Sequence, residues 1–221
     1  ISNARTAEMA KLTENAFRDV NIAFANELSV ICDKQGINVW ELIRLANHHP
    51  RVNILQPGCG VGGHCIAVDP WFIVHETPEE AKLIRTAREV NDSKPAWVMA
   101  QIRKGIEAAL KQKTGSEEKD LTIACFGLAF KPDIDDLRES PALKITLQLA
   151  TEFKGRVIAV EPNIRALPDK IANQNIHLRS TEDALTDADV IVLLVDHAPF
   201  RNIPADTLAH KNIVDAKGIW R

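Results

Sequence analysis

Residues 121–127 read Leu-Thr-Ile-Ala-Cys-Phe-Gly, an apolar run that stops at a glycine. A short run of this kind, bounded by a turn residue, is typical of a buried strand. Further candidate strands lie at 157–160, 176–178, 190–195 and 213–214. Helical patterns at 140–153 and 182–185 separate them. Strands that alternate with helices predict a parallel, doubly wound sheet of the α/β class over residues 121–221.

The sequence before this sheet is mainly helical in pattern. From residue 4 to about 34, apolar residues recur at three- and four-residue steps, and Gly36 fits a helix stop just beyond. Further helical patterns cover residues 39–47, 71–74, 78–91 and 95–111. We expect Pro95 to kink or split the last stretch, because proline cannot donate a helical hydrogen bond. Residues 1–112 are therefore predicted to form a mainly helical domain.

Residues 114–120, Thr-Gly-Ser-Glu-Glu-Lys-Asp, are polar and lack apolar periodicity. We therefore place a linker or boundary loop at residues 113–120. The chain opens on Ile1 rather than methionine, and the helical pattern starts almost at once. We expect the chain to be a fragment whose upstream part is missing.

The bulk composition is that of an ordinary globular protein. The chain has 221 residues and a net charge of −3, which gives no electrostatic case for a nucleic acid or an anionic membrane as partner. No apolar run is long enough for a membrane span, and no secretory signal opens the chain. Sparse cysteines argue for a reducing compartment, so we expect a cytoplasmic location. They are Cys32, Cys59, Cys65 and Cys125.

Cys65 follows a loop that contains Gly58, Gly60, Gly62 and Gly63. A thiol just beyond such a loop can face a cleft, and a thiolate stabilised by nearby cations is a nucleophile. Two alternatives remain: a buried small hydrophobic residue, or a zinc site shared with Cys59 and His64. The adjacent positions of His64 and Cys65 and the lack of a CxxC pair disfavour zinc, so we expect no metal.

Two other constellations could carry chemistry. Lys11, Asn15 and Arg18 share one helix face. The alternative interpretation of this face is an ordinary solvated surface. The second is the segment 127–141, which joins a strand to a helix N-terminus, where parallel sheets bind ligands and phosphates. The alternative interpretation of this segment is a long surface loop whose charges are solvated. Gly127 stands alone, so no complete GxGxxG motif for NAD is present.

Taken in order, three motifs resemble the UDP-glucose/GDP-mannose dehydrogenase family over essentially the whole chain. They are AEMAKLTEN at 7–15, GVGGHCIAVDP at 60–70, and GLAFK at 127–131 continued by RESP at 138–141. Residues 47–53 and 19–27 resemble the branch that oxidises UDP-N-acetyl-D-mannosamine. The resemblance implies a central helical domain that forms a homodimer and a Rossmann-like domain that binds a UDP-sugar. It also implies an N-terminal NAD-binding Rossmann domain, which these residues do not contain.

The resemblance implies NAD-dependent oxidation of a sugar 6-hydroxyl to a uronic acid. Cys65 would be the nucleophile that forms a thiohemiacetal and then a thioester. Lys11 would stabilise developing negative charge and take part in proton transfer, and Asn15 would hold water or an oxyanion. Asp69 would position or activate water. From the pattern alone, Asp69 reads as a helix N-cap followed by Pro70 at the first helical position.

The resemblance also implies a set of binding residues. Substrate contacts are expected at Arg18, His49, Arg51, Gly62, Phe130, Lys131 and Lys217. Arg51 would reach the neighbouring subunit's site, and Lys217 stands where related enzymes often have arginine, so its contact is weaker. Arg138 would contact NAD. The alternative function is a fragment that binds a UDP-sugar and dimerises but is inactive without the N-terminal domain.

Overall fold

The computed structural model describes residues 3–172 and 174–220. The chain forms two compact units, Ile1–Lys94 and Pro95–Arg221, which we call the N-terminal unit and the C-terminal unit. Helix α4 (Lys82–Gln112) contributes its first part to the N-terminal unit and the remainder to the C-terminal unit. Ile1 and Arg221, the outer limits of the expected domains, lie outside the described residues.

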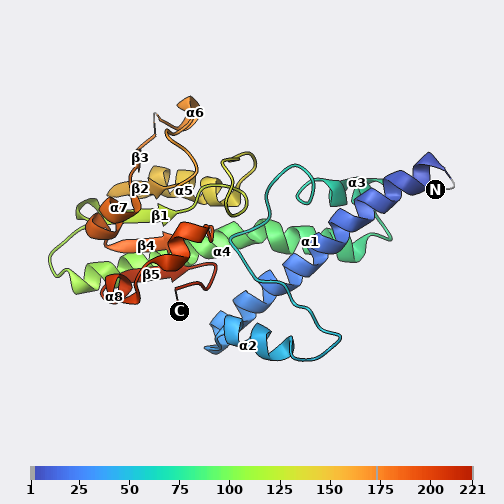
Figure 1. The fold of residues 1–221 in the computed structure, drawn as a ribbon, viewed down its shortest axis with the longest axis horizontal. Helices are drawn as coiled ribbons and strands as arrows, with labels where there is room; N and C mark the ends of the chain where they lie inside the picture. The colour runs from blue at the N-terminus through green and yellow to red at the C-terminus, as the bar shows by residue number, and fades with distance from the viewer. Residues whose placement is uncertain (1–2, 173, 221) are drawn as a thin grey trace. The chain divides into compact units, whose positions relative to one another are not determined.

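The N-terminal unit is helical, as its sequence pattern predicts (Figure 1). Its elements are α1 (Ala4–Gln35), α2 (Val39–Ala46), α3 (Asp69–Glu76) and the first part of α4. The side chain of Asn3 caps the start of α1 by accepting a hydrogen bond from the Thr6 N–H, and Gly36 ends the helix in the left-handed conformation. Within the described ranges, no helix has the length and apolar character that crossing a bilayer requires.

Helix α4 continues unbroken through Pro95. Of the expected kink or split, the split is therefore wrong, and one helix replaces the two that the pattern indicated. Pro95 cannot donate to the carbonyl of Asn91, but a helix can lose one such bond when packing on both sides supports it. Val98, Met99 and Ile102 just beyond the proline are fully or almost fully buried.

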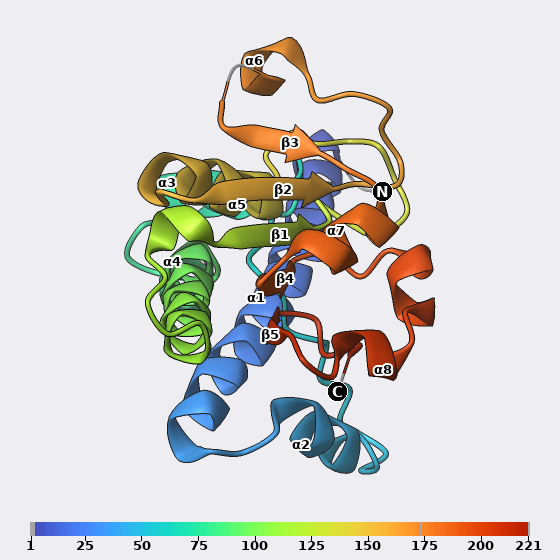
Figure 2. The ribbon, with the colours of Figure 1, turned by 90° about the vertical axis from the view of Figure 1, so that its left-hand side faces the viewer.

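The C-terminal unit contains a five-stranded parallel sheet in the order β3-β2-β1-β4-β5 (Figure 2). The strands are β1 (Thr122–Phe126), β2 (Arg156–Val160), β3 (Ile176–Leu178), β4 (Val190–Leu193) and β5 (Asn212–Asp215). The other elements are η1 (Glu118–Asp120), α5 (Pro141–Glu152), α6 (Asp169–Ala172), α7 (Thr181–Asp187), η2 (Ala198–Asn202) and α8 (Ala205–Leu208). The predicted α/β class and Rossmann-like sheet are confirmed. The strand order reverses between β1 and β4, where such sheets bind ligands.

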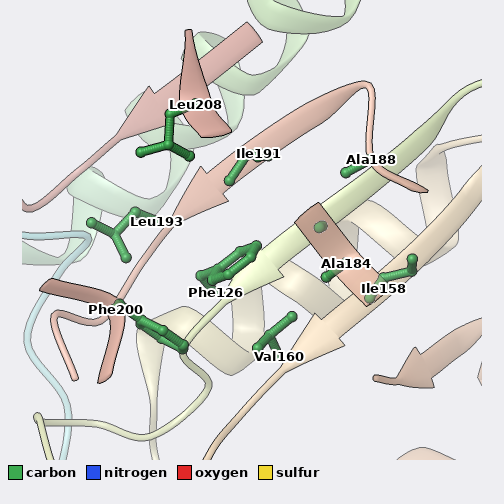
Figure 3. Packing of buried hydrophobic residues seen from close by; sticks show 10 residues of the cluster. Phe126, Ile158, Val160, Ala184, Ala188, Ile191, Leu193, Phe200 and Leu208 are labelled. Atoms are coloured by element: carbon green, nitrogen blue, oxygen red, sulfur yellow. The ribbon is translucent and has the colours of Figure 1, made fainter. Parts of the chain in front are cut away.

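Side chains alternate between the two faces of this sheet. On one face Phe126 packs edge-on against Phe200 and Trp220, within an apolar cluster that includes residues of α7 and α8 (Figure 3). On the opposite face Cys125 meets Thr146 of α5, and burial raises the pKa of the Cys125 thiol to about 12. Cys125 is therefore a core residue that stays protonated. Helices cover both faces of the sheet, and loops lie at the edge where the carboxyl ends of the strands meet.

We expect Gly127→Ala to lower the free energy of unfolding by about 3 kcal/mol, measured by urea denaturation. Gly127 has φ 89°, and a Cβ there would lie 2.4 Å from the Cβ of Val195 and 2.9 Å from its backbone nitrogen. Gly115→Ala is the matched control, because Gly115 has φ 88° but a Cβ there would meet no atom within 4 Å. It should lose only about 1 kcal/mol, and equal losses in the two variants would contradict the steric argument.

Candidate active site

Cys65 is the exposed member of the four free cysteines, all of which lie within the described ranges. Its carbonyl oxygen accepts hydrogen bonds from the N–H groups of Val68 (3.0 Å) and Asp69 (2.8 Å). Cys65 therefore begins the turn that leads into α3. Cys65 and Asp69 are thus joined across this turn by a backbone hydrogen bond.

Asp69 is joined to α1 by a short side-chain hydrogen bond. The Nδ2 of Asn15 donates to the Oδ2 of Asp69 at 2.6 Å, and Asn15 is only 3% exposed. The interpretation of Asp69 as a helix cap is corrected: α3 begins at Asp69, its cap residue is Val68, and no side chain caps it. Two of the predicted catalytic residues are thus in direct contact, beside the turn that carries the third.

Lys11 and Arg18 do not share this contact. Both are exposed on α1, and Lys11 forms an ion pair with Glu14 at 3.1 Å. The Lys11 side chain is 63% exposed, and an ion pair between exposed groups contributes little. Its ammonium can therefore turn to another anion at small cost.

The loop after α2 carries His49 and Arg51, and both side chains are exposed. The N–H of Arg51 donates to the Nδ1 of His49 at 3.3 Å. The amide of Asn47 closes the loop: its Oδ1 accepts from the N–H of Ile54 at 2.7 Å, and its Nδ2 donates to the Ile54 carbonyl at 2.9 Å. Asn47 is the first residue of the branch motif 47–53, but no role was predicted for it, although asparagine commonly makes such loop bonds.

The glycine-rich loop before Cys65 is anchored to α1 by Asn26, which is fully buried. The Oδ1 of Asn26 accepts from the N–H of Gly58 at 2.9 Å, and its Nδ2 donates to the Oδ1 of Asn91 at 2.9 Å. The left-handed backbone positions of this loop fall on Gly60 and Gly63 rather than on Gly62. Asn26 and Asn91 were missed as site residues, because an amide in a helical pattern gives no indication of what it will face.

The same buried layer continues to a charged pair. The Nδ2 of Asn91 donates to the Oδ1 of Asp19 at 2.8 Å, and the Nη1 of Arg88 donates to the same oxygen at 2.6 Å. Burial raises the pKa of the Asp19 carboxyl, although Arg88 and Asn91 oppose the shift. Arg88 also contacts Asp92 on its own helix. These polar groups hold α1 against α4 inside the N-terminal unit.

Lys94 ends this layer. Its Nζ donates to the Oγ of Ser29 at 2.6 Å, and the side chain is buried. Burial lowers the pKa of Lys94 to about 7, although nearby Cys59 and Asp33 favour the charged form. An amino group whose pKa is close to 7 is thus buried near Cys59 of the glycine-rich loop.

In the C-terminal unit, Phe130 and Lys131 lie on the loop that follows β1. The Nζ of Lys131 stands 5.7 Å from the centre of the Phe130 ring, within range of a cation–π contact. The N–H of Phe130 donates to the carbonyl of Asp136 at 3.2 Å. The side chain of Asp136 in turn accepts hydrogen bonds from the guanidinium of Arg138, among them Nε to Oδ1 at 2.9 Å and Nη2 to Oδ2 at 2.7 Å. The predicted binding residues of this loop are therefore structurally linked.

Lys217 follows β5 at the same edge of the sheet. Its Nζ lies 3.2 Å from the Oδ1 of Asp196, an ion pair whose angles do not make a hydrogen bond. Burial acts to raise the pKa of Asp196, but the charges of Lys217 and Arg201 outweigh it and the pKa is lowered. Asp215 fixes the backbone here by accepting from the N–H groups of Lys217 (2.8 Å) and Gly218 (2.6 Å).

A buried carboxylate, Glu161, lies between the loops that follow β1, β2 and β4. Its Oε2 accepts from the N–H groups of Leu128 (2.7 Å) and Ala129 (3.1 Å) and lies 3.0 Å from the Nε2 of His197. Burial acts to raise the pKa of Glu161, but the hydrogen bonds from His197 and Leu128 outweigh it, so the pKa is lowered. Neither Glu161 nor His197 was predicted from the sequence.

Two family models cover most of the chain. Residues 5–93 match the central domain of the UDP-glucose/GDP-mannose dehydrogenase family, and residues 124–221 match its UDP binding domain. The chain belongs to this family. The resemblance seen in the three sequence motifs is thereby confirmed.

Individual dehydrogenases of the family are similar to this chain. A UDP-N-acetyl-D-mannosamine dehydrogenase of Salmonella typhi is 61% identical over 221 residues, which is 100% of this chain and 52% of the relative. An NDP-N-acetyl-D-galactosaminuronic acid dehydrogenase of Ralstonia nicotianae is 57% identical over 220 residues, again 100% of this chain and 49% of the relative. The chain thus spans about half the length of the curated relatives it matches.

Solved structures of family members have the same fold. A UDP-D-ManNAc dehydrogenase of Pyrococcus horikoshii superposes with a TM-score of 0.82 at 38% identity, over 99% of this chain and 50% of that one. The UDP-N-acetyl-mannosamine dehydrogenase Cap5O of Staphylococcus aureus gives a TM-score of 0.80 at 43% identity, over 98% and 49% of the two chains. Among the described residues of the present chain, no group of three His, Cys, Asp or Glu side chains lies close enough together to hold a metal ion.

We expect the free energy of unfolding to rise with pH between about 7 and 10.5 because of Lys94. In this window the lysine is largely neutral in the folded chain but protonated in the unfolded chain, whose lysine pKa is 10.5. The unfolded state then binds more protons, so stability rises with pH, by about 4 kcal/mol across the window. Lys94→Met should flatten the slope in urea denaturation. Exposed Lys34→Met should keep it, and a wild-type slope in Lys94→Met would contradict the assignment.

Proposed function

We propose that this chain is the nucleophile-bearing and UDP-sugar-binding part of an NAD-dependent UDP-sugar 6-dehydrogenase, with UDP-N-acetyl-D-mannosamine as the favoured substrate. The observation that carries the proposal is the Asn15–Asp69 hydrogen bond beside exposed Cys65. The family membership and the 61% identity to a UDP-N-acetyl-D-mannosamine dehydrogenase support it.

The proposed chemistry at Cys65 oxidises an aldehyde to an acid. The thiolate sulfur bonds to the aldehyde carbon at C6 and the oxygen takes up a proton, which gives a thiohemiacetal. Oxidation of this adduct gives a thioester. Water then attacks the thioester carbon, the sulfur leaves with its electron pair, and the uronic acid is released. NAD, when bound, would accept the hydride in this oxidation and in the preceding one, which converts the 6-hydroxyl to the aldehyde.

The neighbours of Cys65 suit the water and oxyanion steps. The Asp69 carboxylate can accept a proton from the attacking water, while the Asn15 amide keeps that carboxylate in place. Lys11, whose partner Glu14 is exposed, can bring an ammonium to a developing oxyanion.

The substrate-binding role rests on charge at exposed positions. Arg18, His49 and Arg51 present donors that suit sugar hydroxyls and phosphates, with Arg51 proposed to act on the neighbouring subunit's substrate. Phe130 and Lys131 of the loop after β1 are proposed to meet the nucleotide and its phosphates. Lys217 is proposed to make a weaker contact, because Asp196 already neutralises its charge. Gly62 would contribute close backbone approach rather than a side chain.

NAD does not fit the C-terminal unit in the manner of a dinucleotide-binding sheet. The N–H groups of Leu128 and Ala129, which would face a pyrophosphate, already donate to Glu161. At the start of α5, the Oγ of Ser140 accepts from the N–H of Leu143 at 3.2 Å. We therefore propose that the dinucleotide is held outside the two units, with exposed Arg138 reaching toward it.

A second candidate function follows from the length of the chain, which covers about half of its curated relatives. By itself the chain would bind a UDP-sugar and dimerise without turning it over. The two candidates separate in an assay that mixes the purified chain with NAD and UDP-N-acetyl-D-mannosamine and follows NADH absorbance. Sustained turnover would refute a dinucleotide site outside the two units.

We expect Cys65→Ser in the full-length protein to abolish uronic acid formation while UDP-sugar binding persists. The serine hydroxyl is a far weaker nucleophile than a thiolate, and an oxyester formed on it would hydrolyse through a different leaving group. Product is measured by mass spectrometry and binding by calorimetry. Cys32→Ala is the control, since Cys32 is buried between α1 and α2, and it should keep activity. Normal acid formation by Cys65→Ser would refute the covalent route.

We propose that α1 pairs with a second copy of the chain to form a homodimer. Phe17, Phe24 and Ile31 recur at seven-residue steps on one face of α1 and are 68%, 55% and 42% exposed. Large apolar side chains in line on a solvent face are typical of a subunit interface. The central domain of the family is expected to dimerise, which supports the proposal.

The double variant Phe17→Glu/Phe24→Glu should be monomeric, because two buried carboxylates per chain would face each other across the interface. Light scattering should give twice the chain mass of 24.5 kDa for the wild type and a single chain mass for the variant. Leu45→Glu is the control: it changes an exposed side chain of α2, and the variant should remain dimeric. A wild type that stays monomeric at high concentration would contradict the proposal.

A further inference from the structure

The Glu161 carboxylate takes the place that a phosphate holds in a dinucleotide-binding sheet. In such sheets the turn after the first strand presents backbone N–H groups to the pyrophosphate, and an acidic residue after the second strand binds the ribose. Here the acidic residue after β2, Glu161, itself accepts hydrogen bonds from the N–H groups of Leu128 and Ala129. The anion that this turn requires is therefore built into the chain.

His197 extends this arrangement to the outer part of the loop. Its Nδ1 accepts from the N–H of Asp133 at 2.9 Å, so that nitrogen carries no hydrogen. The ring hydrogen is therefore on Nε2, where it donates to Glu161 at 3.0 Å. The Oδ1 of Asp133 accepts from the N–H of Ala198 at 2.8 Å, which returns the chain of bonds to the segment after β4.

Asn163 completes the set. Its backbone N–H and its Nδ2 both donate to the Oε1 of Glu161 at 3.2 Å. Asp133 has φ 60°, a left-handed conformation that is costly for a residue other than glycine and persists only where its surroundings impose it. The hydrogen bonds that Asp133 donates to His197 and accepts from Ala198 supply that constraint. The loop is thus held in one strained conformation by side chains that follow two other strands.

We propose that Glu161 and His197 are positioning residues for UDP binding: they fix the loop 128–136 so that Phe130 and Lys131 face the nucleotide, and they close the backbone cradle to any external phosphate. The inference rests on the proposed binding of UDP by the C-terminal unit. The phosphates of UDP must then be held by side-chain cations such as Lys131 instead of the turn after β1. The same arrangement excludes a dinucleotide from this sheet.

The test measures the affinity of the 221-residue chain for UDP by titration calorimetry. Glu161→Ala leaves the donors of Leu128, Ala129 and His197 without their acceptor and should weaken UDP binding roughly tenfold or more. Added formate, a small carboxylate that fits the vacated place, should restore affinity in this variant. Glu182→Ala is the control, because it changes an exposed side chain of α7. It should bind UDP as the wild type does, with or without formate.

A pair of substitutions at His197 decides the matter if Glu161→Ala does not fold. His197→Asn places an amide oxygen near the position of Nδ1 and can keep an acceptor for Asp133, whereas His197→Leu cannot. His197→Asn should therefore bind UDP more tightly than His197→Leu at similar melting temperatures. If folded Glu161→Ala and His197→Leu both bind UDP within about twofold of the wild type, the inference is overturned. A wild-type chain that does not bind UDP would instead refute the proposed function.

Discussion

Every buried backbone N–H needs an acceptor, and in both units a polar side chain supplies one to a loop without regular structure. Asn26 does so for Gly58, and Glu161 does so for Leu128 and Ala129. An unsatisfied buried N–H costs about 1–3 kcal/mol, a large part of the net stability of a domain. The two loops that carry the candidate nucleophile and the candidate nucleotide contacts are therefore held by buried polar side chains of other segments.

The buried polar layer of the N-terminal unit illustrates the balance of this arrangement. Asp19 and Arg88 form an ion pair that is almost fully buried, and such pairs seldom add net stability over an apolar replacement. What the layer provides is a defined fit, because amide and carboxylate partners match in only one register along two helices. An apolar seam would let α1 slide against α4, and the loop bonded to Asn26 would move with it.

The strands and long helices could be predicted because their apolar residues repeat at the period of the element. The four-residue helices α6 and α8 could not, since they are shorter than any helical repeat. Asn15 and Asp69 were assigned through family motifs, and the structure adds that they touch. Glu161 could not be found: its partners Leu128 and His197 lie 33 and 36 residues away, and nothing local indicates that its carboxylate turns inward.

The burial of three of the four cysteines concentrates the thiol chemistry of the chain at one place. Cys125 is closed within the sheet, and Cys32 and Cys59 are also buried, whereas Cys65 is exposed. Peroxide or an electrophile would therefore meet Cys65 first, and its sulfenic acid would lie beside no other exposed thiol of the described chain with which to form an internal disulfide. Oxidation of the exposed thiol to a sulfenic acid would therefore inactivate the proposed chemistry, and an external thiol would reverse it.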